Sequence, residues 1–185
     1  AGQRLSTQLR EIPIPLTGGV LGLRVGWTHQ QRLLRLAPVR ELDDLRSITL
    51  LQGHGWSELD IFDSSGLRTY EAGSDDLFHL VDQQRVDLLP RGVSEIQWDQ
   101  EVVDNLSKAV VIDPYLLLVY PFAGFYYVSL ENNKLAEAIN AGFKNIKSDG
   151  SYQKLLESLV YTRWLRDQLN LSKRKVIFIP NPQAR

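Results

Sequence analysis

The side chains best suited to chemistry are few, and the three histidines come first. His29, His54 and His79 fall at the end of an expected strand, in a loop and in an expected helix, and none has a second ligand at the spacing of a metal site. The chain has no cysteine, which excludes thiolate nucleophiles, disulfides and cysteine zinc sites. No nucleophile elbow and no nucleotide-binding glycine motif occurs. We therefore expect no metal, no cofactor and no enzymatic activity.

The loop that follows the apolar run Ile48–Leu51 is a candidate anion site. Two glycines lie in it, just before Ser57, which can begin a helix. Such a strand-to-helix junction exposes backbone N–H groups beside the positive end of a helix, which suits a carboxylate or another anion. The alternative is a plain strand-to-helix turn. The residues of the candidate site are Gly53, His54, Gly55, Trp56 and Ser57.

Arg91 is the second candidate ligand-binding residue. It follows the expected strand at residues 86–89, and open α/β sheets bind ligands at the carboxyl ends of their strands. The guanidinium could hold an anion through a forked pair of hydrogen bonds, with Trp56 as a wall of the pocket. The alternative is a salt bridge with Glu95, one helical turn along the chain.

Composition limits the classes of function. The 185 residues can bury a substantial core, and 21 basic side chains balance 22 acidic ones. A balance of this kind favours no polyanion-binding surface, so no nucleic-acid partner is expected. No apolar run reaches about 18 residues, so we expect neither a membrane span nor a signal peptide in this chain.

Strands and helices alternate between about residues 40 and 113. Four strands are expected, at 48–51, 67–72, 86–89 and 109–112, with helices between them at 57–63, 74–81 and 94–106. This alternation is typical of a mostly parallel α/β sheet. Before it, residues 20–27 form an expected strand. After it come two strand-like runs at 115–120 and 125–130, helices at 132–147 and 151–169, and a closing strand or tail at 176–179.

Taken in order, several segments resemble the type 2 periplasmic solute-binding fold (the periplasmic-binding-protein-like type II fold), which serves polar amino-acid transporters and related sensor domains. Residues 39–45 (Val-Arg-Glu-Leu-Asp-Asp-Leu) and 48–57 resemble the family's short helical turn, strand, glycine loop and helix start. Residues 76–87, ending Gln-Arg-Val-Asp, are similar to a later helix and strand. Residues 125–152, with Asp149-Gly150-Ser151-Tyr152 at their end, match the most specific piece of the family pattern.

The resemblance implies one complete α/β lobe and remnants of another. Residues 1–28 would be a lobe-one remnant with the first crossing, residues 29–124 would be lobe two, and residues 125–185 would hold the second crossing and the C-terminal lobe-one helices. The N-terminal part of lobe one would be missing. The lobe-one arginine that binds a ligand carboxylate in the family would correspond to Arg4, and Arg91 stands where family members place an acid for the ligand ammonium.

Two classes of function follow from this resemblance. The first is non-enzymatic binding of a small polar or anionic solute in an interlobe cleft, for ABC-type uptake or signal sensing, in the bacterial periplasm and with a membrane permease or sensor kinase as partner. The second is a degenerate binding fold that acts as a structural or protein-interaction module. A lyase or dehydratase on the same fold would need a catalytic acid or base, for which Glu58, Asp60 and Glu95 are the candidates, although nothing pairs them. Self-association is also expected through an uncovered lobe-one face of the C-terminal helices, which includes Phe143, Leu155 and Leu159.

Overall fold

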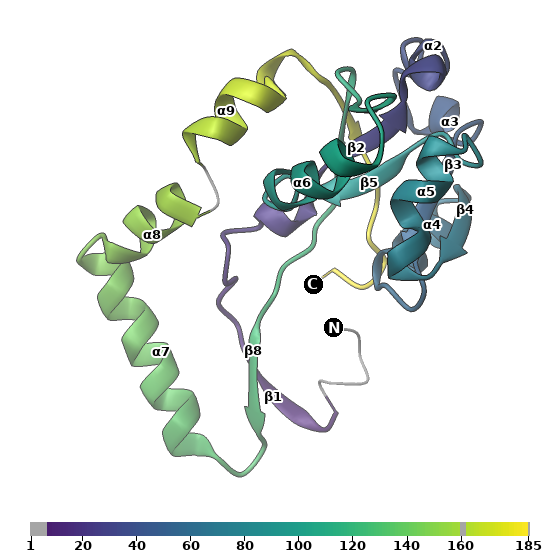
Figure 1. The fold of residues 1–185 in the computed structure, drawn as a ribbon. Helices are drawn as coiled ribbons and strands as arrows, with labels where there is room; N and C mark the ends of the chain where they lie inside the picture. The colour runs from purple at the N-terminus through teal and green to yellow at the C-terminus, as the bar shows by residue number, and fades with distance from the viewer. Residues whose placement is uncertain (1–6, 160–161, 185) are drawn as a thin grey trace.

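The structure is a computed structural model that describes residues 7–159 and 162–184. Figure 1 shows an α/β unit from which an extension of strands and helices curves away. The strands are β1 (Leu9–Ile12), β2 (Leu23–His29), β3 (Thr49–Gly53), β4 (Arg68–Ala72), β5 (Leu89–Gly92), β6 (Val110–Ile112), β7 (Leu116–Val119), β8 (Tyr126–Ser129) and β9 (Lys175–Phe178). The α-helices are α2 (Leu33–Leu36), α3 (Leu42–Leu45), α4 (Glu58–Ser64), α5 (Leu77–Asp82), α6 (Ile96–Leu106), α7 (Asn133–Ser148), α8 (Ser151–Leu159) and α9 (Arg163–Leu169).

The main sheet has the order β5-β2-β7-β9, and β6 also pairs with β2. Strand β2 runs antiparallel to β5, β6 and β7, whereas β7 and β9 are parallel. The mostly parallel direction expected for the strands between residues 40 and 113 is confirmed, because β5 and β6 both run antiparallel to β2 and hence parallel to each other. The antiparallel strand is β2, which precedes them in the sequence. The chain enters the α/β unit through β2 and leaves it through β7. These two strands therefore run in opposite directions and pair antiparallel.

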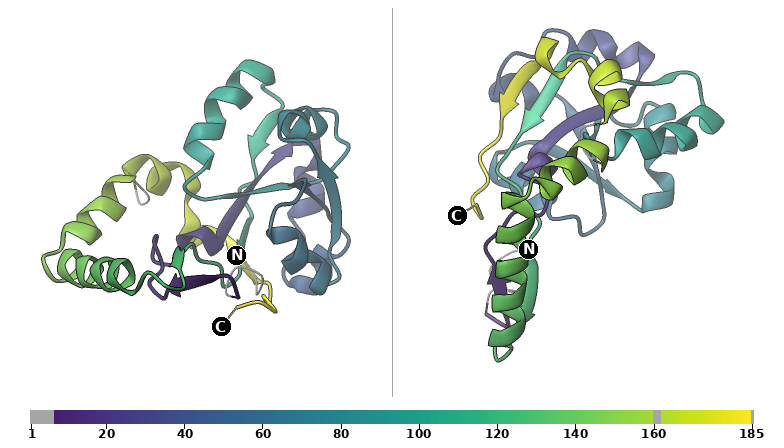
Figure 2. Two further views of the ribbon diagram at one scale, coloured as in Figure 1. Left: turned by 90° about the horizontal axis from the view of Figure 1, so that it is seen from below. Right: turned by 90° about the vertical axis from the view of Figure 1, so that its left-hand side faces the viewer.

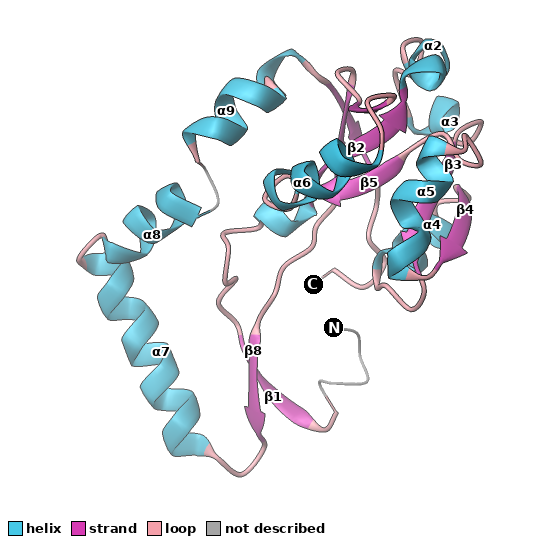
Figure 3. Ribbon diagram, viewed as in Figure 1, coloured by secondary structure: helices cyan, strands magenta, loops and turns pink. Residues whose placement is uncertain are grey.

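Strands β3 and β4 form a parallel pair beside this sheet. The chain just before β5 joins them, because Leu50 and Leu88 form a parallel bridge and the Leu51 N–H donates to the Leu88 carbonyl over 2.9 Å. The segments 48–51 and 86–89 thus lie side by side and parallel, as the alternation of strands and helices predicts. Figure 3 shows the two groups of strands with helices around them.

Two apolar clusters cover opposite faces of the sheet, because alternate residues of a strand point to opposite sides. Leu51 and Leu117 belong to one cluster, while their neighbours Leu50 and Leu116 belong to the other. Helices α5, α6 and α9 pack on the first face, and α2, α3 and α4 pack on the second. The unit therefore has a helix, sheet, helix arrangement in three layers.

The extension is held together by a small core. Strands β1 and β8 form an antiparallel ribbon, and α7 lies along it through a cluster of Ile12, Val128 and Ala136. Figure 2 shows the ribbon and α7 projecting from the α/β unit, with α8 and α9 leading back to it. Two chain segments connect the parts, and they run side by side where the Leu16 N–H donates to the Gly124 carbonyl over 2.9 Å.

The C-terminal region differs from the expectation in its helices and agrees with it in the closing strand. The single helix expected over 151–169 is two helices, because Thr162 begins a new one by accepting a hydrogen bond from the Leu165 N–H at 3.3 Å. Residues after α9 return to the main sheet as β9, and the side chains of Ile177 and Ile179 are buried in its second cluster. The closing segment is thus a strand of the α/β unit, which is the first of the two alternatives expected for residues 176–179.

Candidate functional site

The structure brings together two of the residues singled out in the sequence, Trp56 and Arg91. Three residues after the bridge between Leu50 and Leu88, the neighbouring strands reach Gly53 and Arg91. The Trp56 ring packs on Gly53, where an added Cβ would come within 2.4 Å of the ring. The guanidinium carbon of Arg91 lies 5.2 Å from the centre of that ring, which is within the range of a cation–π contact.

The remaining loop residues are placed differently. The side chain of His54 is exposed, and its Nδ1 lies 3.5 Å from the Glu71 carboxylate on β4, the strand on the side of β3 away from Arg91. The N–H groups of His54 and Trp56 donate to the carbonyls of Ala72 and Gly53, so these two amides are already used within the chain.

Gly55 and Ser57 complete the set of loop residues. Gly55 has a φ of 73°, the left-handed conformation that favours glycine, and so it makes the turn. Ser57 is exposed, and its hydroxyl does not cap α4 but lies 3.4 Å from the Glu58 carboxylate. Arg4 lies outside the described residues.

Arg91 is fixed by carboxylates of α6. Its Nε and Nη2 donate to the two oxygens of Asp99 over 2.7 and 3.0 Å, and Nη2 lies 3.6 Å from Glu95. Burial alone would lower the pKa of the Arg91 guanidinium, but the hydrogen bond to Asp99 and the surrounding carboxylates outweigh it, so this pKa is raised. The salt bridge to Glu95 considered from the sequence is present, and the stronger forked pair is made with Asp99.

Asp99 was missed by the sequence analysis, although a signal was available. It is buried on α6 between Ile96 and Val103, on the same face of the helix as these core residues. A carboxylate on the apolar face of an amphipathic helix needs a buried partner. Asp99 has two, because the Trp27 Nε1–H also donates to it over 3.3 Å.

Arg24 is the second buried cation at this edge, and it too was missed. It lies on β2, and its Nη2 and Nη1 contact the carboxylates of Glu58 at 2.6 Å and Glu95 at 3.0 Å. Its guanidinium carbon lies 5.8 Å from the ring centres of both Tyr120 and Phe122, at the start of the second connection. Burial is the main cause that raises the pKa of the Tyr120 hydroxyl.

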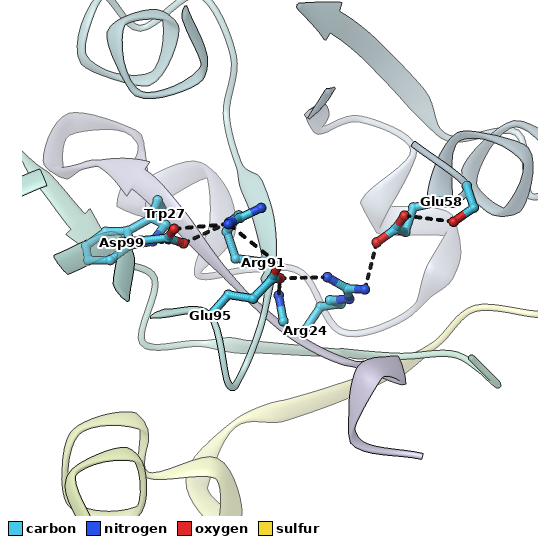
Figure 4. A network of polar contacts seen from close by, with 8 residues as sticks. Arg24, Trp27, Glu58, Arg91, Glu95 and Asp99 are labelled. Carbon is cyan, nitrogen blue, oxygen red and sulfur yellow. Dashed lines mark hydrogen bonds and ion pairs between the residues drawn. The ribbon is translucent and has the colours of Figure 1, made fainter. Parts of the chain in front are cut away.

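These contacts form one network, shown in Figure 4, which joins β2, β5 and the starts of α4 and α6. Glu95 is its centre, because both guanidinium groups contact its carboxylate. The network presents cations, carboxylates and an aromatic ring at one place, beside the segments that connect the α/β unit to the extension. Its charged members are Arg24, Arg91, Glu58, Glu95 and Asp99.

Three further features concern binding in the described chain. A hollow of about 620 Å³ lies between the start of α3, the end of α4 and residues 180–182, and none of the network residues lines it. Within residues 7–159 and 162–184, no three His, Cys, Asp or Glu side chains are grouped closely enough to hold a metal ion. No helix in the same part of the chain combines the length and the apolar composition that a membrane span requires.

Comparison with known proteins gives matches among solved structures. No protein-family model and no curated protein sequence matches the chain. An ancestral amino-acid-binding protein, described as a precursor of cyclohexadienyl dehydratase, superposes with a TM-score of 0.58 at 13% identity, covering 86% of this chain and 65% of that one. An amino-acid ABC transporter substrate-binding protein from Streptococcus pneumoniae bound to L-arginine gives 0.59 at 12% identity, with 86% and 63% covered. An ancestral arginine-binding protein bound to arginine gives 0.57 at 16% identity, with 86% and 68% covered.

These similarities concern the fold, because the identities are low. The chain spans 65% and 63% of the lengths of the first two proteins, less than two thirds of either. Partial coverage of that kind agrees with the one α/β unit and the smaller extension described above. The chain has the type 2 periplasmic solute-binding fold, as one α/β lobe with part of a second.

Proposed function

We propose that the chain binds a small polar or anionic solute without catalysing a reaction, and that Arg91, Trp56 and the loop at residues 53–57 contact it. The observation that carries the proposal is the placement of the Arg91 guanidinium over the Trp56 ring, at the ends of neighbouring strands. An aromatic face and a fixed cation at the carboxyl edge of an α/β sheet suit a small polar ligand.

The chemistry of the ligand follows from the charges at this edge. The structural neighbours include proteins described as binding arginine and other amino acids. In this chain a cation, Arg91, stands where the family places an acid for the ligand ammonium, so an α-amino acid would not be held in the usual way. A solute that offers an acceptor group to Arg91 fits better. Binding of the solute in the periplasm would serve uptake through a membrane permease or signalling through a sensor kinase.

A protein-interaction module is the second candidate function. It is favoured by the contacts that already occupy the site, since Asp99 takes the forked pair of Arg91 and the amides of His54 and Trp56 are bonded within the chain. A fold that has lost its ligand would keep such internal bonds.

A thermal-shift screen tests the first candidate against the second. The probes are amino acids, small carboxylates and phosphorylated metabolites, and a ligand at about 100 times its Kd should add roughly 2.7 kcal/mol to the free energy of unfolding. Trp56→Ala should abolish the shift given by any active probe. Trp98→Ala is the matched control, because Trp98 lies on α6 with its side chain 81% exposed and should leave the shift unchanged.

Three results would speak against solute binding at this edge. A flat screen favours the interaction module. A shift that survives Trp56→Ala places the ligand elsewhere, and a shift lost equally in Trp98→Ala points to a general effect on stability.

A further inference from the structure

The carboxylate of Glu95 occupies a place built for an anion. Its Oε2 accepts hydrogen bonds from the Gly92 N–H over 2.5 Å and from Arg24 Nη1 over 3.0 Å, and its Oε1 faces Arg91 Nη2 at 3.6 Å. A backbone amide and two guanidinium groups thus converge on one carboxylate. Donors of these kinds, gathered from two strands, form a carboxylate cradle. Figure 4 shows the two arginines, Arg24 and Arg91, beside Glu95.

Gly92 keeps this cradle open. A Cβ at position 92 would lie 2.7 Å from the Glu95 Oε2 and 3.3 Å from the Arg24 Nη1. The first distance is too short for any real contact, so a side chain here would push the carboxylate away from the amide. The close approach of an anion to the backbone therefore depends on glycine at this position.

The two arginines do not depend on Glu95 for charge compensation. Arg24 keeps Glu58 at 2.6 Å, and Arg91 keeps Asp99 at 2.7 Å. The Arg24 side chain is only 6% exposed and that of Arg91 16%, whereas that of Glu95 is 38% exposed. The Nε of Arg24 is buried and has no acceptor among the described residues. The donors are thus fixed, and the carboxylate they hold is the most accessible member of the network.

From these contacts we infer that the Gly92, Arg24 and Arg91 cradle is a carboxylate-binding subsite, and that Glu95 fills it as a built-in competitor which a solute carboxylate displaces. The inference rests on the proposed function and names the chemical class of the ligand group at that site. The exchange conserves charge, because one carboxylate replaces another on the same donors. The displaced Glu95 side chain moves toward solvent, to which it is already partly open.

The built-in competitor has a measurable consequence. A solute must break the contacts of Glu95 before it makes its own, so the wild-type affinity is lower than the cradle alone would give. Removing the Glu95 carboxylate should therefore tighten the binding of carboxylates, the opposite of what is expected when a residue that contacts the ligand is removed.

Isothermal titration calorimetry on the whole chain tests this, with acetate, succinate and inorganic phosphate as probes in a low-chloride buffer. Glu95→Ala should bind acetate or succinate about tenfold more tightly than the wild type, since charged hydrogen bonds no longer have to be broken. Glu95→Gln should give a smaller gain, because its amide still fills the cradle. Glu101→Ala is the matched control: it removes one exposed acid from the same helix and should leave the affinity unchanged.

A third variant checks the place of binding. Adding Arg24→Gln to Glu95→Ala should abolish the gain, with circular dichroism to confirm that the double variant is folded. Equal or weaker carboxylate binding by Glu95→Ala overturns the inference, as does a preference of this variant for phosphate or an equal gain in Glu101→Ala.

The failures of the two proposals can be told apart. If the wild type binds a solute in the thermal-shift screen while Glu95→Ala gains nothing, the inference falls and the proposed function stands. If Glu95→Ala binds carboxylates tightly while the wild-type screen is flat, the cradle is real, but Glu95 keeps it closed and the solute-binding function falls.

Discussion

The partner of Arg91 in the structure is Asp99, whereas the sequence suggested Glu95. The sequence places Arg91 just beyond an expected strand, at the sheet edge where a ligand is expected to bind, and offers Glu95, one helical turn along, as an acid partner. Which acid takes the forked pair depends on how α6 packs on the sheet, and the packing brings Asp99 to 2.7 Å. The apolar face of α6 indicates that Asp99 has a buried partner, but local spacing does not say that this partner is Arg91.

Replacing Arg91 should affect stability as well as binding. Arg91→Ala leaves the buried carboxylate of Asp99 with only the Trp27 indole as a side-chain donor among the described contacts, at 3.3 Å. A lost charged hydrogen-bond partner costs about 1.5–3 kcal/mol of the free energy of unfolding. Urea unfolding should show this loss, and Arg91→Lys should recover only part of it because an ammonium cannot reproduce the fork.

The control for this prediction is Arg163→Ala. Arg163 pairs with Asp167 at 3.6 Å on an exposed face of α9, and such surface pairs are worth about 0–1 kcal/mol. A double variant, Arg91→Ala with Asp99→Ala, should cost less than the sum of the two single changes, because each single change leaves the other charged side chain without its forked pair. Additive costs would mean that the two side chains do not stabilise each other.

At the scale of elements, two backbone segments approach each other closely where the two connections meet. An added Cβ on Gly22 would lie 2.0 Å from the Tyr120 carbonyl oxygen, and the Tyr120 N–H donates to the Gly22 carbonyl over 3.1 Å. Two main chains thus touch at a glycine, immediately before β2 and after β7. Any side chain at position 22 must separate them.

Gly22→Ala should therefore destabilise the chain by about 1–3 kcal/mol through overpacking, measured by urea unfolding. Gly142→Ala is the contrasting control, since position 142 lies inside α7 and nothing is found within 4 Å of its added Cβ. Alanine there should raise the free energy of unfolding by about 0.5–1 kcal/mol, because it is the better helix former. Equal effects of the two substitutions would contradict the close contact.

The order and type of most elements could be predicted from periodicity, capping residues and turns, because these signals are local. The helix α7 matches the apolar spacing of Leu135, Ile139 and Phe143 and the glycine stop after Asp149. Strand direction is not a local property, so the antiparallel placement of β2 was missed. The break between α8 and α9 depends on Thr162, whose capping role is hidden inside an otherwise helical pattern.

For the whole molecule, burial is uneven between the α/β unit and the extension. Two large clusters cover the main sheet, whereas among the described residues β1, β8 and α7 share a small buried core of Ile12, Val128 and Ala136. Phe143, which the sequence suggested would lack cover, packs between the rings of Tyr126 and Tyr152 at 6.0 and 6.2 Å. Tyr126, Leu135 and Leu155 remain about half exposed. The side chain of Leu159, also expected to lack cover, lies outside the described residues.

Exposed apolar side chains on a thinly packed element favour association. We therefore expect this chain to self-associate through the extension, and sedimentation velocity between roughly 1 and 100 micromolar should show a sedimentation coefficient that rises with concentration. The double substitution Leu135→Gln with Leu155→Gln should weaken this rise, because it removes apolar area from α7 and α8 without touching the buried core. Leu34→Gln is the control. Leu34 is 84% exposed on α2 of the α/β unit, so its replacement should leave the rise of the sedimentation coefficient unchanged. A monomer at every concentration would contradict self-association. If Leu34→Gln abolished the rise of the sedimentation coefficient, the chains would associate through the α/β unit and not through the extension.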